Sequence, residues 1–398
     1  MNLFFLRAVL RRELLLTPKF EELMEKTRLD AERYRKVEQT DKFREYLMLE
    51  KVVASSDFQA KKRELTRKKY KETEESRKMT RLAELKKDKY VRQYLKNGEG
   101  EGRQSVIQYE ELRKETETED FRLRNAFWQD ANRWQGTDEG RQEARFEALK
   151  KDEDIQFYLK ANKSAIEQFE QFEKVYEDDF TWTRLEASDW KPGIVYPSDK
   201  FVREHTFTNE LQAYNKGRNI ETADSILNIK TIKENVTAPA WDAKKGMVMK
   251  DFKYTSDIIS NDKVAIEEGM VVQVKVRCRG FLNHGIYLRS KKHIPFISLF
   301  DYTGLKAYVG AKDKHDSNDH LKMLDGLQPI RYIVYTVSWQ KDEIVWFVNN
   351  LEVYRTKNLI PFGEKLYMHL YSFISPKARR VTEGKLQVDW VRVYKRKK

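Results

Sequence analysis

Residues 272–279 read Val-Gln-Val-Lys-Val-Arg-Cys-Arg, and their alternation decides the fold class of the C-terminal half. Valine and cysteine occupy every second position, the period that places side chains on one face of a half-buried strand. Similar runs lie at 332–339, 344–348, 365–372 and 386–394. Because these runs follow at short spacing without helical patterns between them, they predict an all-β sandwich or jelly roll.

The preceding half has a different texture. No proline occurs between Pro18 and Phe180, glycine is sparse, and Glu, Lys, Arg, Gln, Leu and Ala dominate. These six residue types are all good helix formers. Apolar residues recur at spacings of three and four, as in Phe43, Tyr46 and Leu47. This half is therefore predicted to be helical.

The helical half also repeats itself. Tyr46–Leu49 corresponds to Tyr109–Leu112 at an offset of 63 residues, and Leu85–Asp88 corresponds to Leu149–Asp152 at an offset of 64. Thr40–Leu47 looks like the tail of an earlier, truncated copy. A repeat of this length is expected to contain two or more long, coiled-coil-like helices, and each copy has little apolar surface to bury by itself. Such helices need a neighbouring repeat, a second chain or a protein partner.

The chain is therefore divided into an N-terminal helical segment at 1–45, helical repeats at 46–108 and 109–177, and a β domain at 178–398. The expected fold class is α + β multidomain, with helical repeats followed by an all-β jelly-roll sandwich. The helices are expected to serve as an arm for a protein partner or for self-association.

Charge is distributed unevenly between the two halves. Residues 1–180 contain 40 basic and 39 acidic side chains, whereas residues 181–398 contain 37 basic and 25 acidic ones. The basic excess of the second half favours an anionic partner, either RNA or a membrane surface. The lysine- and arginine-rich run at 61–69 is followed closely by acids, so it is interpreted as a solvated helix face.

Three features of the sequence bear on the cellular location: the single cysteine, the absence of long apolar runs and the composition of residues 1–12. The lone cysteine, Cys278, excludes an internal disulfide and is expected to be a buried apolar side chain. No run of 18 apolar residues occurs, so no membrane-spanning helix is predicted. Residues 1–12 lack the apolar core of a secretory signal. They fit either the start of an amphipathic helix or a mitochondrial-type presequence, and the expected location is intracellular, in the cytoplasm or the mitochondrion.

The β half resembles a known family along its length. The motifs that carry the resemblance are Asp178-Asp179-Phe180, Ser188-Asp189-Trp190, Thr208 to Tyr214, Phe252 to Ser256, Ile344 to Asn350 and Val388 to Tyr394. In this order they resemble glycoside hydrolase family 16 over 178–394. The resemblance implies the concanavalin A-like jelly roll, two curved antiparallel sheets whose concave face holds a glycan in active members.

The catalytic residues that the resemblance implies are missing. A retaining glycosidase needs two carboxyl groups about 5 Å apart. In the family these acids lie on alternate residues of one strand, here within Pro295 to Gly304. The nucleophile position falls on Phe296 and the assisting aspartate on Ser298. The acid/base falls on Phe300 or, if the strand has a bulge, on Asp301. The site is therefore predicted to be degenerate.

The same resemblance gives a short set of glycan-cleft candidates. These are Trp190, Glu210, His284, Tyr287 and Asp301. Tyr287 could stack on a sugar ring, whereas His284 fits a satisfied structural histidine better. For Trp190 and Glu210, fixing the start of the sandwich is an equal alternative.

No cofactor is predicted. The loop 312–320 contains Asp313, His315, Asp316 and Asp319, but their spacing fits no metal cage. Family members often bind a structural calcium ion, and no residue pattern here identifies one.

Three functions remain open from the sequence. The favoured one is a non-catalytic binding or structural protein with a helical interaction arm. A lectin-like β-glycan-binding protein is the second, and an active hydrolase with a rearranged site is the third. Binding to β-linked polysaccharides would distinguish the second from the first, and the third needs a second carboxyl group within about 5–10 Å of Asp301.

Overall fold

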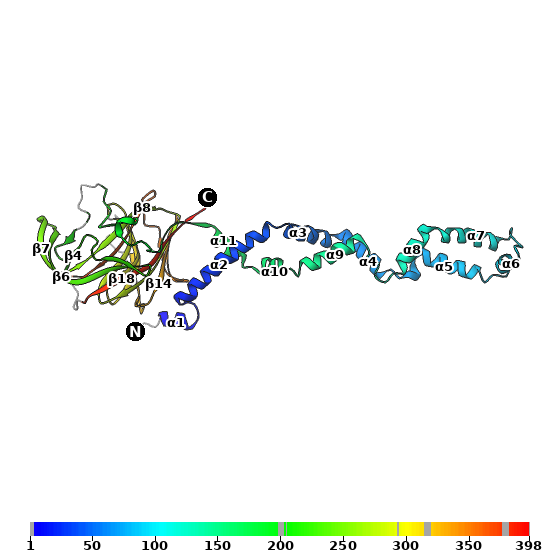
Figure 1. Ribbon diagram of the computed structural model, residues 1–398, viewed down its shortest axis with the longest axis horizontal. Coiled ribbons are helices and arrows are strands. Elements are labelled where there is room, and N and C mark those ends of the chain that lie inside the picture. The colour runs from blue at the N-terminus through cyan, green and yellow to red at the C-terminus, as the bar shows by residue number, and fades with distance from the viewer. Residues whose placement is uncertain are drawn as a thin grey trace. The chain divides into compact units, whose positions relative to one another are not determined.

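A computed structural model describes residues 4–197, 203, 205–292, 294–313, 320–375 and 382–397. The chain divides into two compact units (Figure 1). The sandwich unit contains Met1–Arg28 and Ser164–Lys398, and the helical unit contains Leu29–Lys163. β1 (Phe172–Asp178) lies almost entirely within the stretch predicted as the second helical repeat, 109–177, yet it pairs with the last strand of the sandwich.

The helical unit consists of short helices. Their bounds are α2 (Thr17–Glu38, which begins in the sandwich unit), α3 (Asp41–Ala54), α4 (Ser56–Arg67), α5 (Glu74–Leu85), α6 (Lys89–Asn97), α7 (Gln104–Glu117), α8 (Glu119–Gln129), α9 (Asp138–Leu149) and α10 (Glu153–Lys160). The predicted repeat start at Tyr46 falls inside α3, and Thr40, in the stretch interpreted as an earlier copy's tail, is the cap of that helix. Each repeat thus contains four helices of 8 to 14 residues, rather than long coiled-coil-like ones.

Side-chain caps explain why the helices are short. Ser55, Thr73 and Asp88 each accept a hydrogen bond from a backbone N–H of the helix that follows. Thr118, Thr137 and Asp152 do the same one repeat later. Each cap satisfies donors that an uninterrupted helix would satisfy within itself, so the chain can turn at each of these points.

The two helical repeats pack against each other in a reciprocal way. The first helix of one repeat packs on the third helix of the other, since α3 contacts α9 and α5 contacts α7. Two equivalent apolar clusters result, Phe43, Tyr46, Leu49, Phe146, Leu149 and Ile155 in one, and Leu82, Leu85, Val91, Val106 and Tyr109 in the other. Neither repeat therefore completes a core by itself, as the sparse apolar pattern predicts.

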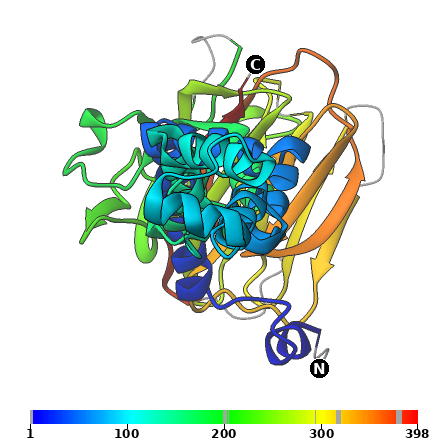
Figure 2. The ribbon, with the colours of Figure 1, turned by 90° about the vertical axis from the view of Figure 1, so that its right-hand side faces the viewer.

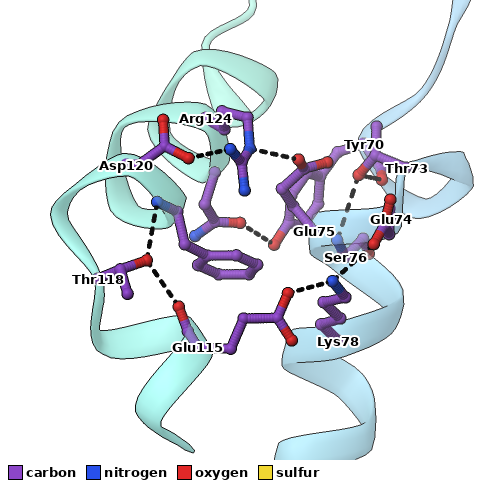
Figure 3. A network of polar contacts seen from close by, with 12 residues as sticks. Tyr70, Thr73, Glu74, Glu75, Ser76, Lys78, Glu115, Thr118, Asp120 and Arg124 are labelled. Atoms are coloured by element: carbon purple, nitrogen blue, oxygen red, sulfur yellow. Dashed lines mark hydrogen bonds and ion pairs between the residues drawn. The ribbon is translucent and has the colours of Figure 1, made fainter. Parts of the chain in front are cut away.

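Polar contacts follow the same pseudo-symmetry. Arg124 of α8 contacts Glu75 of α5 and also Asp120 (Figure 3). The equivalent pair one repeat away is Lys61 with Glu139. Arg124 and Lys61 are about half exposed, whereas Glu75 is buried. Because one partner of each pair is solvated, each pair contributes about 0–1 kcal/mol to stability.

The strands of the sandwich unit form two sheets among the described residues. The larger has the order β16-β15-β14-β9-β18-β6-β7-β4, with β1 paired to β18 and with β3 and β5 paired to β6. The smaller has the order β13-β12-β11-β10-β17-β8-β2.

The remaining elements have the following bounds. The helices are α1 (Phe4–Leu10) and α11 (Lys163–Glu170). The strands after β1 are β2 (Trp190–Pro192), β3 (Thr206–Phe207), β4 (Gln212–Tyr214), β5 (Ile220–Ala223), β6 (Ile226–Asp242), β7 (Gly246–Ser256), β8 (Ile258–Ile266), β9 (Met270–Arg279), β10 (Asn283–Arg289), β11 (Phe296–Tyr302), β12 (Ala307–Lys312), β13 (His320–Leu324), β14 (Ile333–Trp339), β15 (Glu343–Val348), β16 (Leu351–Lys357), β17 (Leu366–Phe373) and β18 (Gly384–Arg396).

The core lies between the two sheets. Val274 and Trp346 of the larger sheet meet Ile286 and Leu370 of the smaller one in a single buried cluster. Cys278 is buried in the same cluster, as its alternation with arginines predicts. The predicted sandwich is therefore confirmed. Among the described residues, none of the helices combines the length and apolar character needed to cross a bilayer.

The first 28 residues contribute to this unit. Phe5 and Ala8 of α1 join the core cluster, and α1 lies beside the strands in Figure 2, drawn in dark blue. Phe20 of α2 packs on Val334 and Trp390, at the outer face of the larger sheet. The amphipathic-helix interpretation of residues 1–12 thus agrees with the packing of α1.

Candidate functional site

A bulge in β11 determines which residues share a face. Tyr287 on β10 pairs with Ser298, whereas Ile286 pairs with Phe300, so one extra residue is accommodated between them. Because directly paired residues point to the same side of a sheet, Phe296, Ser298 and Asp301 all lie on the face opposite the core. Phe300 belongs to the core cluster. Of the two sequence alternatives, the structure therefore selects the bulged one, with Asp301.

Two neighbouring strands complete this outer face. Tyr371 of β17 and Asp301 of β11 both pair with Gly285 of β10. A Cβ atom on Gly285 would lie 2.4 Å from Cζ of Tyr371. The glycine therefore allows the Tyr371 ring to lie across β10, where it stacks on the Tyr287 ring with centroids 5.4 Å apart.

The Asp301 carboxyl group is strongly perturbed. Burial raises its pKa to about 6, while hydrogen bonding with Tyr287 and the charge of Arg289 act in the opposite direction. Burial dominates because the charged form loses more hydration than these two groups restore. Near neutral pH the group can therefore hold or release a proton.

Arg289 is the cation of this face. Its guanidinium carbon lies 4.6 Å from the ring centroid of Tyr287, and it also lies over Phe296 and Tyr371. Such contacts with aromatic rings stabilise a guanidinium by about 0.5–2 kcal/mol. The guanidinium group thus lies close to three aromatic rings, and its charge acts on the carboxyl group of Asp301.

On β11, the described residues that share the outer face with Asp301 are Phe296 and Ser298. No other acid contributes to the pKa shift of Asp301. Retention of configuration requires a nucleophile and an acid/base about 5 Å apart. Asp301 is a buried carboxyl group in an aromatic setting.

Three of the predicted cleft residues lie elsewhere. The His284 ring stacks on Tyr302 inside the sandwich, and burial lowers its pKa to about 3, so the imidazole is neutral. Trp190 is buried in the core, where its Nε1–H donates to Asp178 at 2.7 Å. The buried positions of His284 and Trp190 follow from strand alternation, because both side chains point from β10 and β2 toward the space between the two sheets.

Glu210 lies near the aromatic cluster, but its charge does not act on Asp301. Its Oε2 accepts a hydrogen bond from the backbone N–H of Phe207 at 3.0 Å, and burial raises its pKa. Its charge acts on Tyr214, which packs against the aromatic cluster, but not on Asp301. Of the five predicted cleft residues, the structure thus brings together Tyr287 and Asp301.

Sequence reasoning missed the contribution of β17. Tyr367, His369, Tyr371 and Phe373 alternate with core residues, and this period-two pattern is visible in the sequence. His369 Nε2 accepts a hydrogen bond from the backbone N–H of Val195 at 3.2 Å, which holds residues 194–196 over the face. The alternation predicts which side chains share a face, whereas the covering segment depends on contacts between residues far apart in sequence.

Metal ligands do not gather in the described part of the chain. In the polar loop that the sequence singled out, Asp313 is described, whereas His315, Asp316 and Asp319 lie outside the described residues. The sequence identified no calcium site, and the expectation of no cofactor stays a prediction.

A separate cavity of about 640 Å³ lies outside the larger sheet. Met24, Phe169, Phe172, Trp390 and Tyr394 supply most of its apolar wall. Two arginines at its rim form ion pairs, Arg28 with Glu25 and Arg392 with Glu177. Its volume is in the range of small-molecule sites.

The sandwich is similar to solved glucanase structures. An endo-beta-1,3-glucanase from Pyrococcus furiosus is 16% identical, over 57% of this chain and 95% of that one, with a TM-score of 0.46. SCLam, a non-specific endo-beta-1,3(4)-glucanase from family GH16, is 18% identical over 57% and 92%, with a TM-score of 0.47. LamAcat from Zobellia galactanivorans is 19% identical over 56% and 97%, with a TM-score of 0.43.

No protein-family model matches the chain, and no curated protein sequence matches it.

Proposed function

We propose that this chain is a non-catalytic binding protein whose sandwich retains a glycosidase-like architecture without the glycosidase reaction. One observation supports this most directly: the outer-face positions of β11 are Phe296, Ser298 and Asp301, with one carboxyl group among them. Phenylalanine and serine cannot supply the missing carboxylate.

The state of the aromatic face favours a protein-binding or structural role over glycan binding. Tyr287 is 6% exposed and Tyr371 8% exposed, because Ile194, Tyr196 and Tyr214 pack against them. A ring that stacks on a sugar needs a free face, and these rings already contact protein.

The helical unit is the proposed interaction arm. It exposes large apolar side chains, among them Met48, Leu123 and Leu159. Single exposed apolar residues are common on protein surfaces, but here they recur on short helices whose own cores are small. We propose that this arm contacts a protein partner or a second copy of the chain.

The second candidate function is β-glycan binding at the same outer face. Tyr287 and Asp301 favour it, since an aromatic ring beside a polar group is the usual composition of a sugar site. It requires residues 194–196 to move away from the rings. The third candidate, an active hydrolase, requires a second carboxyl group beside Asp301.

The deciding experiment is an activity and binding series on the full chain. Incubation with β-1,3-glucan and mixed-linkage β-glucan should release no reducing sugar above the blank. Calorimetry with the same oligosaccharides should give no heat of binding. Sugar release that Asp301→Asn abolishes would contradict the proposal, and binding without release would establish the glycan-binding alternative.

A further inference from the structure

The outer part of the β6–β7 hairpin extends beyond the larger sheet. The pairing of β6 with β18 ends at Thr231, and from Ile232 to Asp242 β6 continues with β7, which returns from Gly246. Figure 1 shows these two strands reaching away from the rest of the sandwich. The turn at Asp242–Gly246 is therefore the outermost point of this ladder.

In the described part of the chain, one face of this extension is buried, and on the other face the His205 ring adjoins Phe207 and Trp241. Ala238, Ala240 and Phe252 are buried against Ala213 of β4. The opposite face belongs to the alternate residues, where Trp241 pairs directly with Met247 and Pro239 pairs with Met249.

Large apolar side chains are exposed on that opposite face. Phe207 of β3 lies beside Trp241, and their exposed fractions are 49% and 43%. Met247 is 41% exposed and Met249 65% exposed. We call these four residues the hairpin patch. Four large apolar side chains gathered at one projecting turn form a contiguous exposed patch, which is a feature of interaction sites.

The turn adds two cations to the hairpin patch. The carboxylate of Asp242 accepts the backbone N–H groups of Lys244 and Lys245, both at 2.9 Å, and the hydroxyl of Thr208 at 3.3 Å. These hydrogen bonds lower the pKa of Asp242. Both lysine side chains are exposed, and neither ammonium group has an ion-pair partner within the described ranges. The acid holds the turn, and the cations face outward beside the patch.

We propose that the hairpin patch docks on an anionic lipid bilayer. Trp241, Met247 and Met249 would enter the headgroup region, and Lys244 and Lys245 would contact lipid phosphates. Tryptophan is enriched at this depth of a bilayer, and apolar contacts combined with basic residues are the two signals of peripheral binding. Each lysine near such a surface raises affinity about fivefold.

Other macromolecules fit the patch less well. Non-specific nucleic-acid binding depends on many phosphate contacts, and the turn provides two cations. Protein interface cores are depleted in lysine, whereas here lysines adjoin the apolar centre. The inference goes beyond the proposed function and does not depend on the face around Asp301.

The first test is co-sedimentation of the full chain with vesicles. We expect binding to phosphatidylcholine vesicles that contain phosphatidylserine, and weak binding to phosphatidylcholine alone. Met247→Ser/Met249→Ser and Lys244→Glu/Lys245→Glu should each reduce binding at least tenfold. Matched controls at other exposed sites are Leu305→Ser/Phe362→Ser and Lys306→Glu/Lys341→Glu, which should bind like the parent.

The second test uses the single buried cysteine. Because Cys278 is inaccessible, Met249→Cys introduces one reactive thiol for a polarity-sensitive fluorophore. Its emission should shift to the blue with phosphatidylserine vesicles, and circular dichroism should show that every variant is folded. Vesicle binding that the hairpin variants leave unchanged, or a blue shift with single-stranded RNA instead of vesicles, would overturn the proposal.

Discussion

The backbone N–H of Asn219 donates a 2.8 Å hydrogen bond to Oδ2 of Asp257, a carboxylate buried inside the sandwich unit. Oδ1 of the same side chain accepts the N–H groups of Asn215 and Gly217, at 3.0 and 3.1 Å. One aspartate thus accepts three N–H groups of the 215–219 turn, and that of Asn215 also donates to the carbonyl of Ser256 at 3.1 Å. Loss of Asp257 would therefore remove the acceptor of the Gly217 and Asn219 N–H groups.

Asp257→Ala should therefore destabilise the sandwich. Unsatisfied buried donors are destabilising by about 1–3 kcal/mol each, so with partial relaxation we expect a loss of about 3–5 kcal/mol in the free energy of unfolding. Urea denaturation followed by tryptophan fluorescence measures it. Asp342→Ala, at an exposed turn, is the control and should stay within about 0.5 kcal/mol of the parent. Equal stability of the two variants would contradict the role given to Asp257.

Gly285→Ala tests the packing of the outer face. The new Cβ would lie 2.4 Å from Cζ and 2.6 Å from the hydroxyl of Tyr371, so the ring must move. We expect a loss of about 1–3 kcal/mol and a change in the near-ultraviolet circular dichroism of the tyrosines. Gly102→Ala has open space at its Cβ and should leave both readouts unchanged.

The raised pKa of Asp301 predicts a pH dependence of stability. An aspartate titrates near pH 3.9 when unfolded and here at about 6, so the folded state retains the proton over this interval. Its contribution is complete below about pH 4 and is lost as pH rises through about pH 6, a change of about 2–3 kcal/mol. Asp301→Asn removes this titration and should be more stable than the parent at pH 8.

The free energy of unfolding must be compared between Asp301→Asn and the parent at each pH, because the titration of His284 changes stability in the opposite direction. Its pKa falls to about 3 on folding, so its contribution is gained as pH rises toward its unfolded value near 6.5. Subtracting the two stability curves cancels His284 and isolates Asp301. A difference curve that is flat between pH 4 and pH 8 would show that Asp301 is not buried as described.

Much of the sandwich was predictable from alternation, and the exceptions have physical causes. Val272, Val274, Val276 and Cys278 face the core, as the period of two requires. The choice between Phe300 and Asp301 stayed open because a bulge adds one residue without a distinctive residue type. Tyr371 was not predicted: the same alternation is present in β17, but the proximity of Tyr371 to Tyr287 depends on strand order, which the sequence pattern does not contain.

The helical half shows two further limits. Its helix ends were visible as Thr73-Glu74-Glu75 and Thr118-Glu119-Asp120, the usual signature of a capped N-terminus, yet long helices were expected. The docking of the N-terminal segment was not predictable, because the Thr17 hydroxyl donates to the carbonyl of Tyr332, 315 positions away. Local pattern contains no information at that separation.

The reciprocal packing of the helical repeats predicts a strong effect at Ile155. This side chain is buried in the cluster that α3 forms with α9 and α10. Truncation of a buried isoleucine removes about 2–5 kcal/mol. We expect Ile155→Ala to lower the melting temperature of the helical signal at 222 nm, whereas Leu159→Ala, exposed on the same helix, should not. An equal effect of the two substitutions would contradict the packing.

The docking of residues 4–28 on the sandwich predicts that Phe20→Ala weakens the β unit, although Phe20 lies on a helix. The ring is buried against Val334 and Trp390, and Glu21 beside it accepts a 2.8 Å hydrogen bond from Lys275 of β9. Loss of a buried phenylalanine should lower the free energy of unfolding by about 3–5 kcal/mol. Hydrogen exchange should then accelerate in β9, β14 and β18, the strands beneath this segment. Leu16→Ala, at an exposed position four residues earlier, is the matched control. If Phe20→Ala leaves exchange in these strands at the rate of the control, the N-terminal segment does not belong to the sandwich unit.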